Sequence, residues 1–230
     1  MTALRSLLFL VWFLTVTTVL ALLFLPVLIL PRGATVWLAR TWSRATFYGL
    51  KLFAGVDWEI RGLPPTGPVL VAAKHMSMWD TLALYLALGE PAIVLKRSLL
   101  YIPFYGWFLW KAAAIAIDRS AGSRALRKMS AAAQKVLGQG RPILIFPEGT
   151  RKKPHAPPDY KPGVAGLYAL LKVPCVPVAL NSGVYWTGFI KKPGTIVLEF
   201  LEPIAPGLKR DTFMTLLENR IETATNRLLP

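Results

Sequence analysis

The chain is poor in the residues that build disulfides and cysteine-based metal sites. It contains one cysteine among 230 residues, Cys175, which lies in the apolar segment VPCVPVAL. A single thiol excludes an intrachain disulfide, and a metal site built on cysteines is excluded with it. We interpret Cys175 as a small buried hydrophobic residue.

Acidic residues are also scarce. There are 12 Asp and Glu against 27 Lys and Arg, which gives a formal net charge of +15 at pH 7. The acids are too few and too scattered for an obvious two-metal site, so no metal is expected. The excess of positive charge indicates an anionic partner, which is a nucleic acid, a phospholipid surface or a phosphorylated substrate.

Charged residues as a class make up only 17% of the chain, whereas hydrophobic residues make up 54%. Soluble domains have roughly 25% charged residues, so part of the apolar surface is expected to face lipid. We find no basic recognition helix and no RNA-binding motif. The composition therefore favours an anionic phospholipid membrane or a phosphorylated lipid over a nucleic acid.

A long uncharged stretch runs from Ser6 to Pro31. It is long enough for a helix to cross a bilayer core of about 30 Å. A signal peptide has an apolar region of only about 7 to 15 residues, so we expect a membrane anchor instead. Whether the segment spans the bilayer or dips into it stays open, because Pro26 can break the helix and turn the chain back.

The following segment, 34–55, is predicted to form a second helix. Its basic residues Arg40, Arg44 and Lys51 fall within about 40° of one another on a helical wheel. The opposite side consists of Leu38, Trp42, Leu52 and Phe53. This pattern is typical of a helix in the membrane interface, and the alternative is a helix packed on the main domain with a solvated basic face. Since positive charge follows the apolar run, the main domain is expected on the cytoplasmic side, in a bacterial inner membrane.

The remainder of the chain, 56–230, alternates short apolar runs with helical patterns. This alternation predicts one α/β domain with a central, mostly parallel sheet flanked by helices, behind a membrane-associated two-helix segment at 1–55. The expected strands are 68–73, 91–96, 113–117, 142–146, 174–180 and 195–201. The expected helices are 81–88, 124–137, 164–171 and a C-terminal one with an apolar stripe of Phe213, Leu217, Ile221 and Leu228. In such sheets the functional groups gather at the carboxyl ends of the strands.

One of the two histidines, His75, lies five residues before Asp80 in the stretch KHMSMWDTLALYL. Ser77 is a good N-cap and Asp80 stands three residues after it, which is close to the capping-box pattern. His75 would then lie in the turn before the helix, within reach of the Asp80 carboxylate. Such a pair can take a proton from a hydroxyl group. The alternative is that Asp80 only caps the helix and that His75 is incidental.

Two further segments follow expected strands. FPEGTRKKP presents Glu148, Thr150 and Arg151 after the strand at 142–146, where an arginine can grip a phosphate with two hydrogen bonds. Lys96 ends the strand at 91–96, and Arg119 follows the strand at 113–117, so both cations are expected at one crevice. Between them, LLYIPFYGWFLW offers an apolar surface for an acyl chain or a membrane. Solvated turns and ordinary core packing are the alternatives.

Four blocks of the sequence together resemble the 1-acyl-sn-glycerol-3-phosphate acyltransferases, a family of glycerophospholipid synthesis. The blocks are HMSMWD, KRSLLYIPFYGWFLWKAAAIAIDR, FPEGTR and VPVAL, in the order that the family has. The resemblance covers about 70–181 and implies that 56–230 is an acyltransferase domain. It also implies an N-terminal two-helix membrane motif and a thioester donor, either acyl-CoA or acyl carrier protein, with no cofactor.

The resemblance implies a role for each matching residue. His75 would be the general base and Asp80 its orienting partner. Lys96, Arg119 and Arg151 would hold the phosphate of the acceptor.

The remaining substrate-binding residues come from the third block. Glu148 and Gly149 would shape the acceptor pocket, and Thr150 belongs to the same set. The fourth block, Val176 to Ala179, would lie on the side of the acyl donor. Lys74 departs from the family, which often has Asn before the histidine.

The activity implied is transfer of an acyl chain to the sn-2 hydroxyl of lysophosphatidic acid, which makes phosphatidic acid. One alternative is the same chemistry on glycerol 3-phosphate, another lysophospholipid or a lyso-aminolipid. Another is a noncatalytic protein that binds lipid at the membrane surface.

Overall fold

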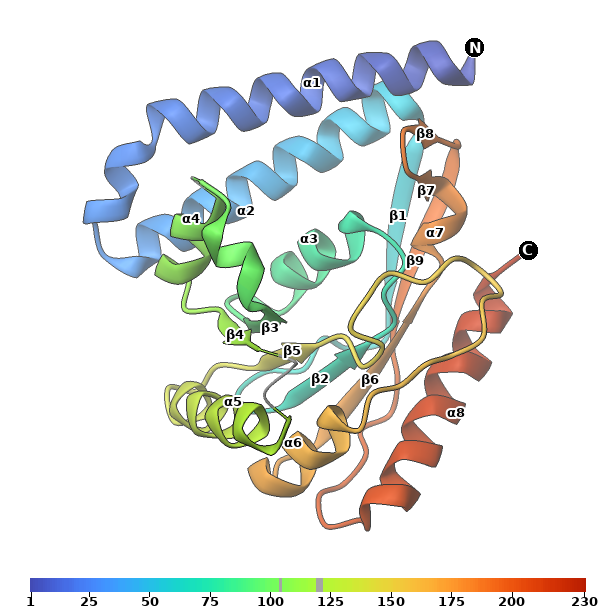
Figure 1. Cartoon of the computed structure of the whole chain (residues 1–230). Coiled ribbons are helices and arrows are strands. Elements are labelled where there is room, and N and C mark those ends of the chain that lie inside the picture. The colour runs from blue at the N-terminus through green and yellow to red at the C-terminus, as the bar shows by residue number, and fades with distance from the viewer. Residues whose placement is uncertain (104, 119–121) are drawn as a thin grey trace.

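A seven-stranded sheet forms the centre of the molecule in the computed structural model, which describes residues 1–103, 105–118 and 122–230 (Figure 1). The strand order is β1-β9-β6-β2-β5-β3-β4. The strands are β1 Val56–Arg61, β2 Leu70–Ala73, β3 Ala92–Lys96, β4 Ile115–Ile117, β5 Ile143–Ile145, β6 Cys175–Leu180 and β9 Gly194–Phe200. Neighbouring strands pair parallel, except that β6 and β9 pair antiparallel. The predicted α/β fold with a mostly parallel sheet is therefore confirmed.

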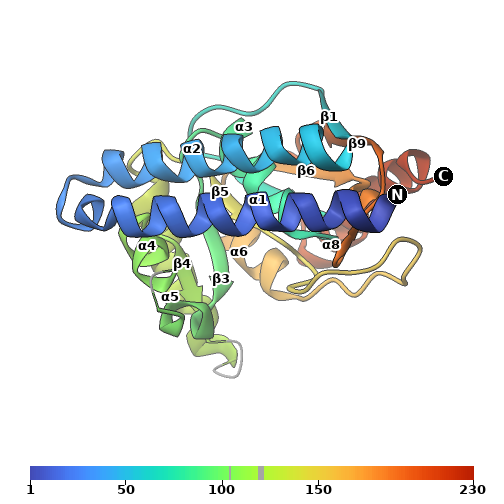
Figure 2. The ribbon, with the colours of Figure 1, turned by 90° about the horizontal axis from the view of Figure 1, so that it is seen from above.

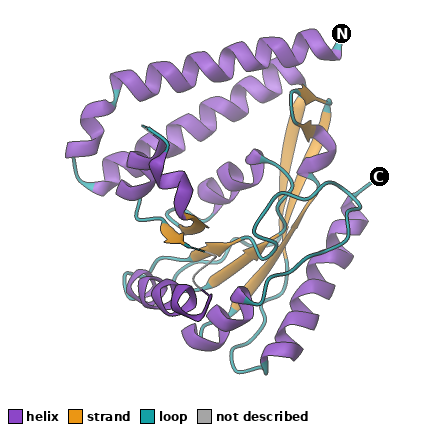
Figure 3. Cartoon of the chain, in the orientation of Figure 1, coloured by secondary structure: helices purple, strands orange, loops and turns teal. Residues whose placement is uncertain are grey.

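Helices cover both faces of the sheet (Figure 3). Their bounds are α1 Thr2–Leu23, α2 Arg32–Gly49, α3 Met78–Ala87, α4 Tyr105–Lys111, α5 Gly122–Leu137, α6 Gly163–Leu171, α7 Ser182–Tyr185 and α8 Arg210–Leu228. Along β2, Leu70 and Ala72 join a core with α5, α6 and α8, whereas Val71 and Ala73 join a core with α2 and α3. Side chains alternate between faces along a strand, so a strand covered on both sides is apolar throughout.

All six expected strands and all four expected helices are present, with boundaries shifted by a few residues. The edge strand β1, with sequence VDWEIR, was not predicted. Its residues become more exposed toward its end, so it has no continuous apolar run. It forms because its backbone pairs in parallel with β9, from Val56 opposite Gly194 to Arg61 opposite Glu199. A small hairpin of β7 Trp186–Thr187 and β8 Ile190–Lys191 was also not predicted.

The N-terminal segment forms a helical hairpin. Pro26 lies in a 3-10 turn, Leu25–Ile29, where α1 has ended and the chain reverses into α2. The two helices then run side by side (Figure 2). Gly49 permits their close approach, because a Cβ there would fall 2.0 Å from Cδ1 of Trp12. Among the described residues, α1 is the one helix that is long and apolar enough to cross a membrane.

The surroundings of α2 differ from those expected of a helix that lies in the membrane interface. Leu38, expected on the lipid side, is only 5% exposed. Trp42, expected beside it, is partly buried, and its indole N–H donates to Thr17 Oγ1 of α1 at 3.0 Å. These contacts favour the alternative of a helix packed on the main domain, whereas Leu52, on the same side, is 55% exposed. Arg44 remains exposed, and α1 instead presents the long apolar surface.

Candidate active site

His75 and Asp80 meet in the turn between β2 and α3. The distance from His75 Nδ1 to Asp80 Oδ2 is 2.9 Å, and the His75 side chain is 13% exposed. The strand ends at Ala73, and the helix begins at Met78 with Ser77 as its N-cap. The five-residue spacing therefore brings the pair together across a helix start, where the chain folds back on itself.

The Asp80 carboxylate caps the helix and binds the imidazole with the same oxygen. Its Oδ2 accepts the backbone N–H of Met76 at 2.6 Å and of Ser77 at 2.8 Å, while Ser77 Oγ accepts the N–H of Trp79 at 3.1 Å. Asp80 thus both caps the helix and contacts His75, and the catalytic role of the pair stays a prediction. A carboxylate that accepts N–H groups favours the tautomer with the proton on Nδ1, so the lone pair of His75 lies on Nε2.

Ser182, which sequence analysis missed, is a further partner of this carboxylate. It begins α7, and its hydroxyl donates to Asp80 Oδ1. Ser77 Oγ lies 2.9 Å from Ser182 Oγ. A signal was present in the sequence, because Asn181 and Ser182 follow the buried strand β6, which lies next to β2 in the sheet.

The FPEGTR turn packs directly against the histidine. It follows β5, which lies next to β2. Phe146 stacks on the imidazole of His75, with ring centroids 3.9 Å apart, and the N–H of Lys152 donates to the carbonyl of His75 at 2.8 Å. Gly149 has φ +68°, a left-handed conformation that suits glycine in this tight turn. Two blocks that are far apart in the sequence therefore form one continuous site.

Glu148 of this turn points into the protein. Its carboxylate lies 3.1 Å from the ammonium of Lys74, and both side chains are buried. Burial raises the pKa of Glu148, and the charge of Lys74 opposes that rise. The Glu148 carboxylate therefore faces Lys74, and its expected role in shaping the acceptor pocket stays a prediction.

Of the expected substrate-binding residues, Lys96, Thr150 and Arg151 are exposed. Because β2, β5, β3 and β4 are parallel neighbours, their carboxyl ends lie on the same side of the sheet. The turns that follow β2 and β5 therefore lie there together with Lys96, which ends β3. Arg151 also acts electrostatically on Tyr105 of α4: burial raises the Tyr105 pKa, and the charge of Arg151 lowers it. Arg119, expected to be a third cation, lies outside the described residues.

The structure also contains an apolar cavity of about 470 Å³, which Pro91 and Ala114 border near the starts of β3 and β4. It is enclosed mainly by α1, α2, α3 and α4, and its lining includes Trp42, Tyr85, Tyr105 and Phe108. Tyr105 therefore stands at the cavity and also within the field of Arg151. Part of the segment LLYIPFYGWFLW lines this cavity. Within the described ranges, no group of three His, Cys, Asp or Glu residues is placed to hold a metal ion.

The sequence model described as Acyltransferase matches residues 58–181, more than half of the chain. The chain belongs to the acyltransferase family. All four blocks lie within the matched range, so the His75–Asp80 pair and the FPEGTR turn belong to the acyltransferase domain. The chain is 37% identical over 164 residues to a 1-acyl-sn-glycerol-3-phosphate acyltransferase of Pseudomonas aeruginosa, covering 70% of this chain and 64% of that protein.

Other acyltransferases extend the comparison. The alpha form of 1-acyl-sn-glycerol-3-phosphate acyltransferase from Ovis aries is 32% identical over 211 residues, which cover 86% of this chain and 72% of that protein. The match to the Pseudomonas aeruginosa acyltransferase spans slightly less than two thirds of that protein. In fold, the chain is similar to the crystal structure of the 1-acyl-sn-glycerophosphate acyltransferase PlsC from Thermotoga maritima. The TM-score is 0.80 at 21% identity, with 99% of this chain and 98% of that chain covered.

Proposed function

We propose that the protein transfers an acyl chain from a thioester donor to the sn-2 hydroxyl of lysophosphatidic acid and so makes phosphatidic acid. The observation that carries this proposal is the imidazole of His75, held by Asp80 at 2.9 Å and packed against the turn that bears Arg151. The names of the relatives support the choice of acceptor.

The first step is deprotonation of the acceptor. The phosphate of lysophosphatidic acid binds the cations Arg151 and Lys96, and its sn-2 hydroxyl gives a proton to Nε2 of His75. The resulting imidazolium is stabilised by the Asp80 carboxylate, which already accepts two backbone N–H groups.

The hydroxyl oxygen attacks the thioester carbonyl as its proton leaves. A tetrahedral oxyanion forms, a new C–O bond is made, and collapse of the oxyanion breaks the C–S bond. His75 returns the proton to the departing thiolate, so the product is an ester and a free thiol. This cycle needs no metal, no cofactor and no covalent intermediate on the enzyme. Either acyl-CoA or acyl carrier protein supplies the thioester.

The apolar cavity between α1, α2, α3 and α4 suits the acyl chain. Its lining is almost wholly apolar, as a site for an acyl chain requires. The exposed apolar surface of α1 would lie in the membrane on its cytoplasmic face, and the net charge of +15 would favour an anionic lipid surface. The acceptor, with its polar head and apolar tail, would then enter the site directly from the bilayer.

The test is acyl transfer from oleoyl-CoA or oleoyl-acyl carrier protein to lysophosphatidic acid by purified protein in detergent. His75→Ala should abolish turnover, and Arg151→Ala should raise the acceptor KM. Arg61→Ala, which removes an exposed cation paired with Glu59, is the matched control and should change neither value. A folded wild-type protein that is inactive with both donors contradicts the proposed acceptor.

Competition among acceptors separates the alternatives within the same chemistry. Glycerol 3-phosphate, another lysophospholipid and a lyso-aminolipid are offered beside lysophosphatidic acid, and the largest kcat/KM identifies the acceptor. A noncatalytic lipid-binding protein would bind vesicles equally with and without His75→Ala and would transfer no acyl chain.

A further inference from the structure

A buried lysine joins the histidine segment to two carboxylates from distant parts of the chain. Lys74, the residue before His75, is 2% exposed. Its Nζ lies 3.1 Å from Glu148 Oε1 in the FPEGTR turn and 2.7 Å from Glu222 Oε1 in α8. The hydroxyl of Tyr160 donates to the same Glu222 oxygen at 2.8 Å. One ammonium group therefore connects three segments behind the site.

The backbone determines the direction of the Lys74 side chain. The N–H of Lys74 donates to the carbonyl of Val178 at 2.9 Å, which continues the pairing of β2 with β6 by one residue. Side chains alternate along this extended segment, so Lys74 follows Leu70 and Ala72 toward the α8 side. His75 faces the opposite side, where Asp80 holds its ring. The two neighbouring residues thus support the site from opposite faces of the sheet.

The charges of this group depend on Lys74. One cation faces two carboxylates, and Glu148 Oε2 is buried with no hydrogen-bond partner among the described residues. Burial raises the pKa of Glu148, and the positive charge of Lys74 is the largest effect that opposes this rise. Burial also raises the pKa of Tyr160, so its hydroxyl stays protonated and donates to Glu222. Removing the ammonium would leave buried carboxylates without a counterion, which is costly.

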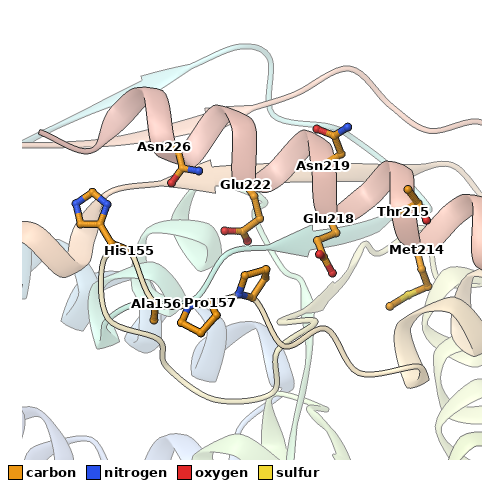
Figure 4. Close-up of a pocket in the computed structure, with 10 residues that line it drawn as sticks. His155, Ala156, Pro157, Met214, Thr215, Glu218, Asn219, Glu222 and Asn226 are labelled. Carbon is orange, nitrogen blue, oxygen red and sulfur yellow. The ribbon is translucent and has the colours of Figure 1, made fainter.

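The two carboxylates differ in their access to water. The Glu222 side chain is 18% exposed, whereas that of Glu148 is 1% exposed. Glu222 points from α8 toward the loop of Ala156 and Pro157, into an open cavity of about 780 Å³ (Figure 4). Water can therefore compensate for a change at Glu222 but not for a change at Glu148. The contact with Glu148 is the one through which Lys74 acts on the site.

We propose that Lys74 is a positioning residue, which holds the FPEGTR turn against the His75 segment through Glu148, while Glu222 and Tyr160 hold the ammonium in place. This inference rests on the proposed function where it concerns turnover. The turn contacts the histidine through the Phe146 ring and the Lys152 N–H, on either side of Glu148. A displaced Glu148 would also displace Arg151, three residues later, from the acceptor phosphate.

The variant Lys74→Met keeps the length of the side chain and removes its charge. We expect kcat/KM for lysophosphatidic acid to fall roughly 10- to 100-fold through a raised acceptor KM, because small misplacements of binding groups have effects of this size. The donor KM should stay unchanged. A purely structural role would lower the active fraction, and hence the apparent kcat, without changing the acceptor KM. An acceptor KM that stays within about twofold of wild type overturns the proposal.

Glu222→Gln and the double variant Lys74→Met/Glu222→Gln separate stability from positioning. Glu222→Gln keeps a side-chain oxygen that can accept the hydrogen bond from Tyr160, and it should raise the acceptor KM slightly. This variant therefore tests the proposal even if Lys74→Met does not fold. The double variant lacks the unpaired Glu222 charge but keeps the buried charge of Glu148, so its melting temperature should recover only in part while its acceptor KM stays high. Recovery of both values would overturn the proposal. The control is Lys161→Met, which removes an exposed lysine paired with Asp159 at 2.6 Å.

Hydrogen exchange provides a readout that does not need turnover. The amide of Lys152 donates to His75, so its protection reports directly on the docking of the turn. Lys74→Met should speed exchange of this amide and leave the amides of β9 unchanged. If wild type transfers no acyl chain, the proposed function fails, and this measurement still decides the role of Lys74. An unchanged exchange rate of the Lys152 amide would contradict the positioning role of Lys74.

Discussion

The ring of Phe146 lies against the imidazole of His75, with centroids 3.9 Å apart and planes inclined by 20°. This stacking joins the first residue of FPEGTR to the proposed base. It restricts the rotation of the imidazole, whose Nδ1 is already held by Asp80. The aromatic residue of the motif therefore has a direct structural role beside the proposed chemistry.

Phe146→Leu should lower kcat about two- to tenfold, since an aromatic pair contributes roughly 0.5 to 1.5 kcal/mol beyond its buried area. The leucine keeps the turn apolar but cannot hold the plane of the imidazole. Steady-state kinetics with lysophosphatidic acid measure the change, and Phe189→Leu, at an exposed position of the β7–β8 hairpin, is the control. An unchanged kcat would show that Asp80 alone orients the ring.

Asp80→Asn should lower kcat by about 10³- to 10⁴-fold, because an amide no longer favours the imidazole tautomer that leaves Nε2 as the base. The amide oxygen can still accept N–H groups at the helix start, so the melting temperature should fall only modestly. Asp57→Asn, at a half-exposed carboxylate, is the control and should leave kcat unchanged. Activity near the wild-type level would remove Asp80 from the proposed mechanism.

Ser182→Ala removes the hydroxyl that donates to Asp80 Oδ1. We expect kcat to fall about fivefold, which corresponds to the roughly 1 kcal/mol of a typical hydrogen bond. Ser6→Ala is the matched control, since Ser6 is also buried but donates to Thr2 within α1. Equal kinetics for both variants would restrict Ser182 to packing.

Ala39→Phe tests whether the apolar cavity receives the acyl chain. Ala39 lines the cavity from α2, and a phenyl group there would fill part of the space. The KM for a long-chain acyl donor should rise severalfold, whereas the KM for a short-chain donor should stay near wild type. Ala34→Phe, on the same helix but not among the lining residues, is the control. An equal effect on both donors contradicts the assignment of the cavity.

The free energy of unfolding is expected to depend on pH through the buried side chain of Lys191. Its ammonium lies 4.8 Å from the ring centre of Trp186 and 5.6 Å from that of Phe9, and burial lowers its pKa to about 8. In the unfolded chain the pKa is near 10.5, so unfolding takes up a proton between these values. The free energy of unfolding should therefore rise with pH from 8 toward 10.5, by at most about 1.4 kcal/mol per pH unit.

Lys191→Met removes this proton uptake and should flatten the rise. Thermal unfolding of the detergent-solubilised protein at several pH values measures the difference from wild type. The neighbouring Lys192 is exposed, so Lys192→Met should keep the wild-type slope. Identical slopes for wild type and Lys191→Met would contradict the assignment.

The local features of the site were predictable from the sequence because they depend on contacts between near neighbours. The capping box of Ser77 and Asp80 and the reach of His75 back to Asp80 lie within six residues. The buried strands were equally predictable, since strands covered on both faces are continuous apolar runs. Strand β1 has no such run, so only its pairing with β9 reveals it.

Tertiary structure decided the contacts between groups that are far apart in the chain. Ser182 reaches Asp80 across 102 residues, and Lys74 reaches Glu222 across 148 residues. No local pattern encodes these pairs, because they depend on the order of the strands and on which face of the sheet α8 covers. The same holds for the N-terminal helices: the sequence predicted an apolar helix and a basic one, but only packing showed that α1 and the α/β domain together cover part of the apolar side of α2. A periodic pattern shows that a face must be buried, whereas the partner that buries it is determined by the complete fold.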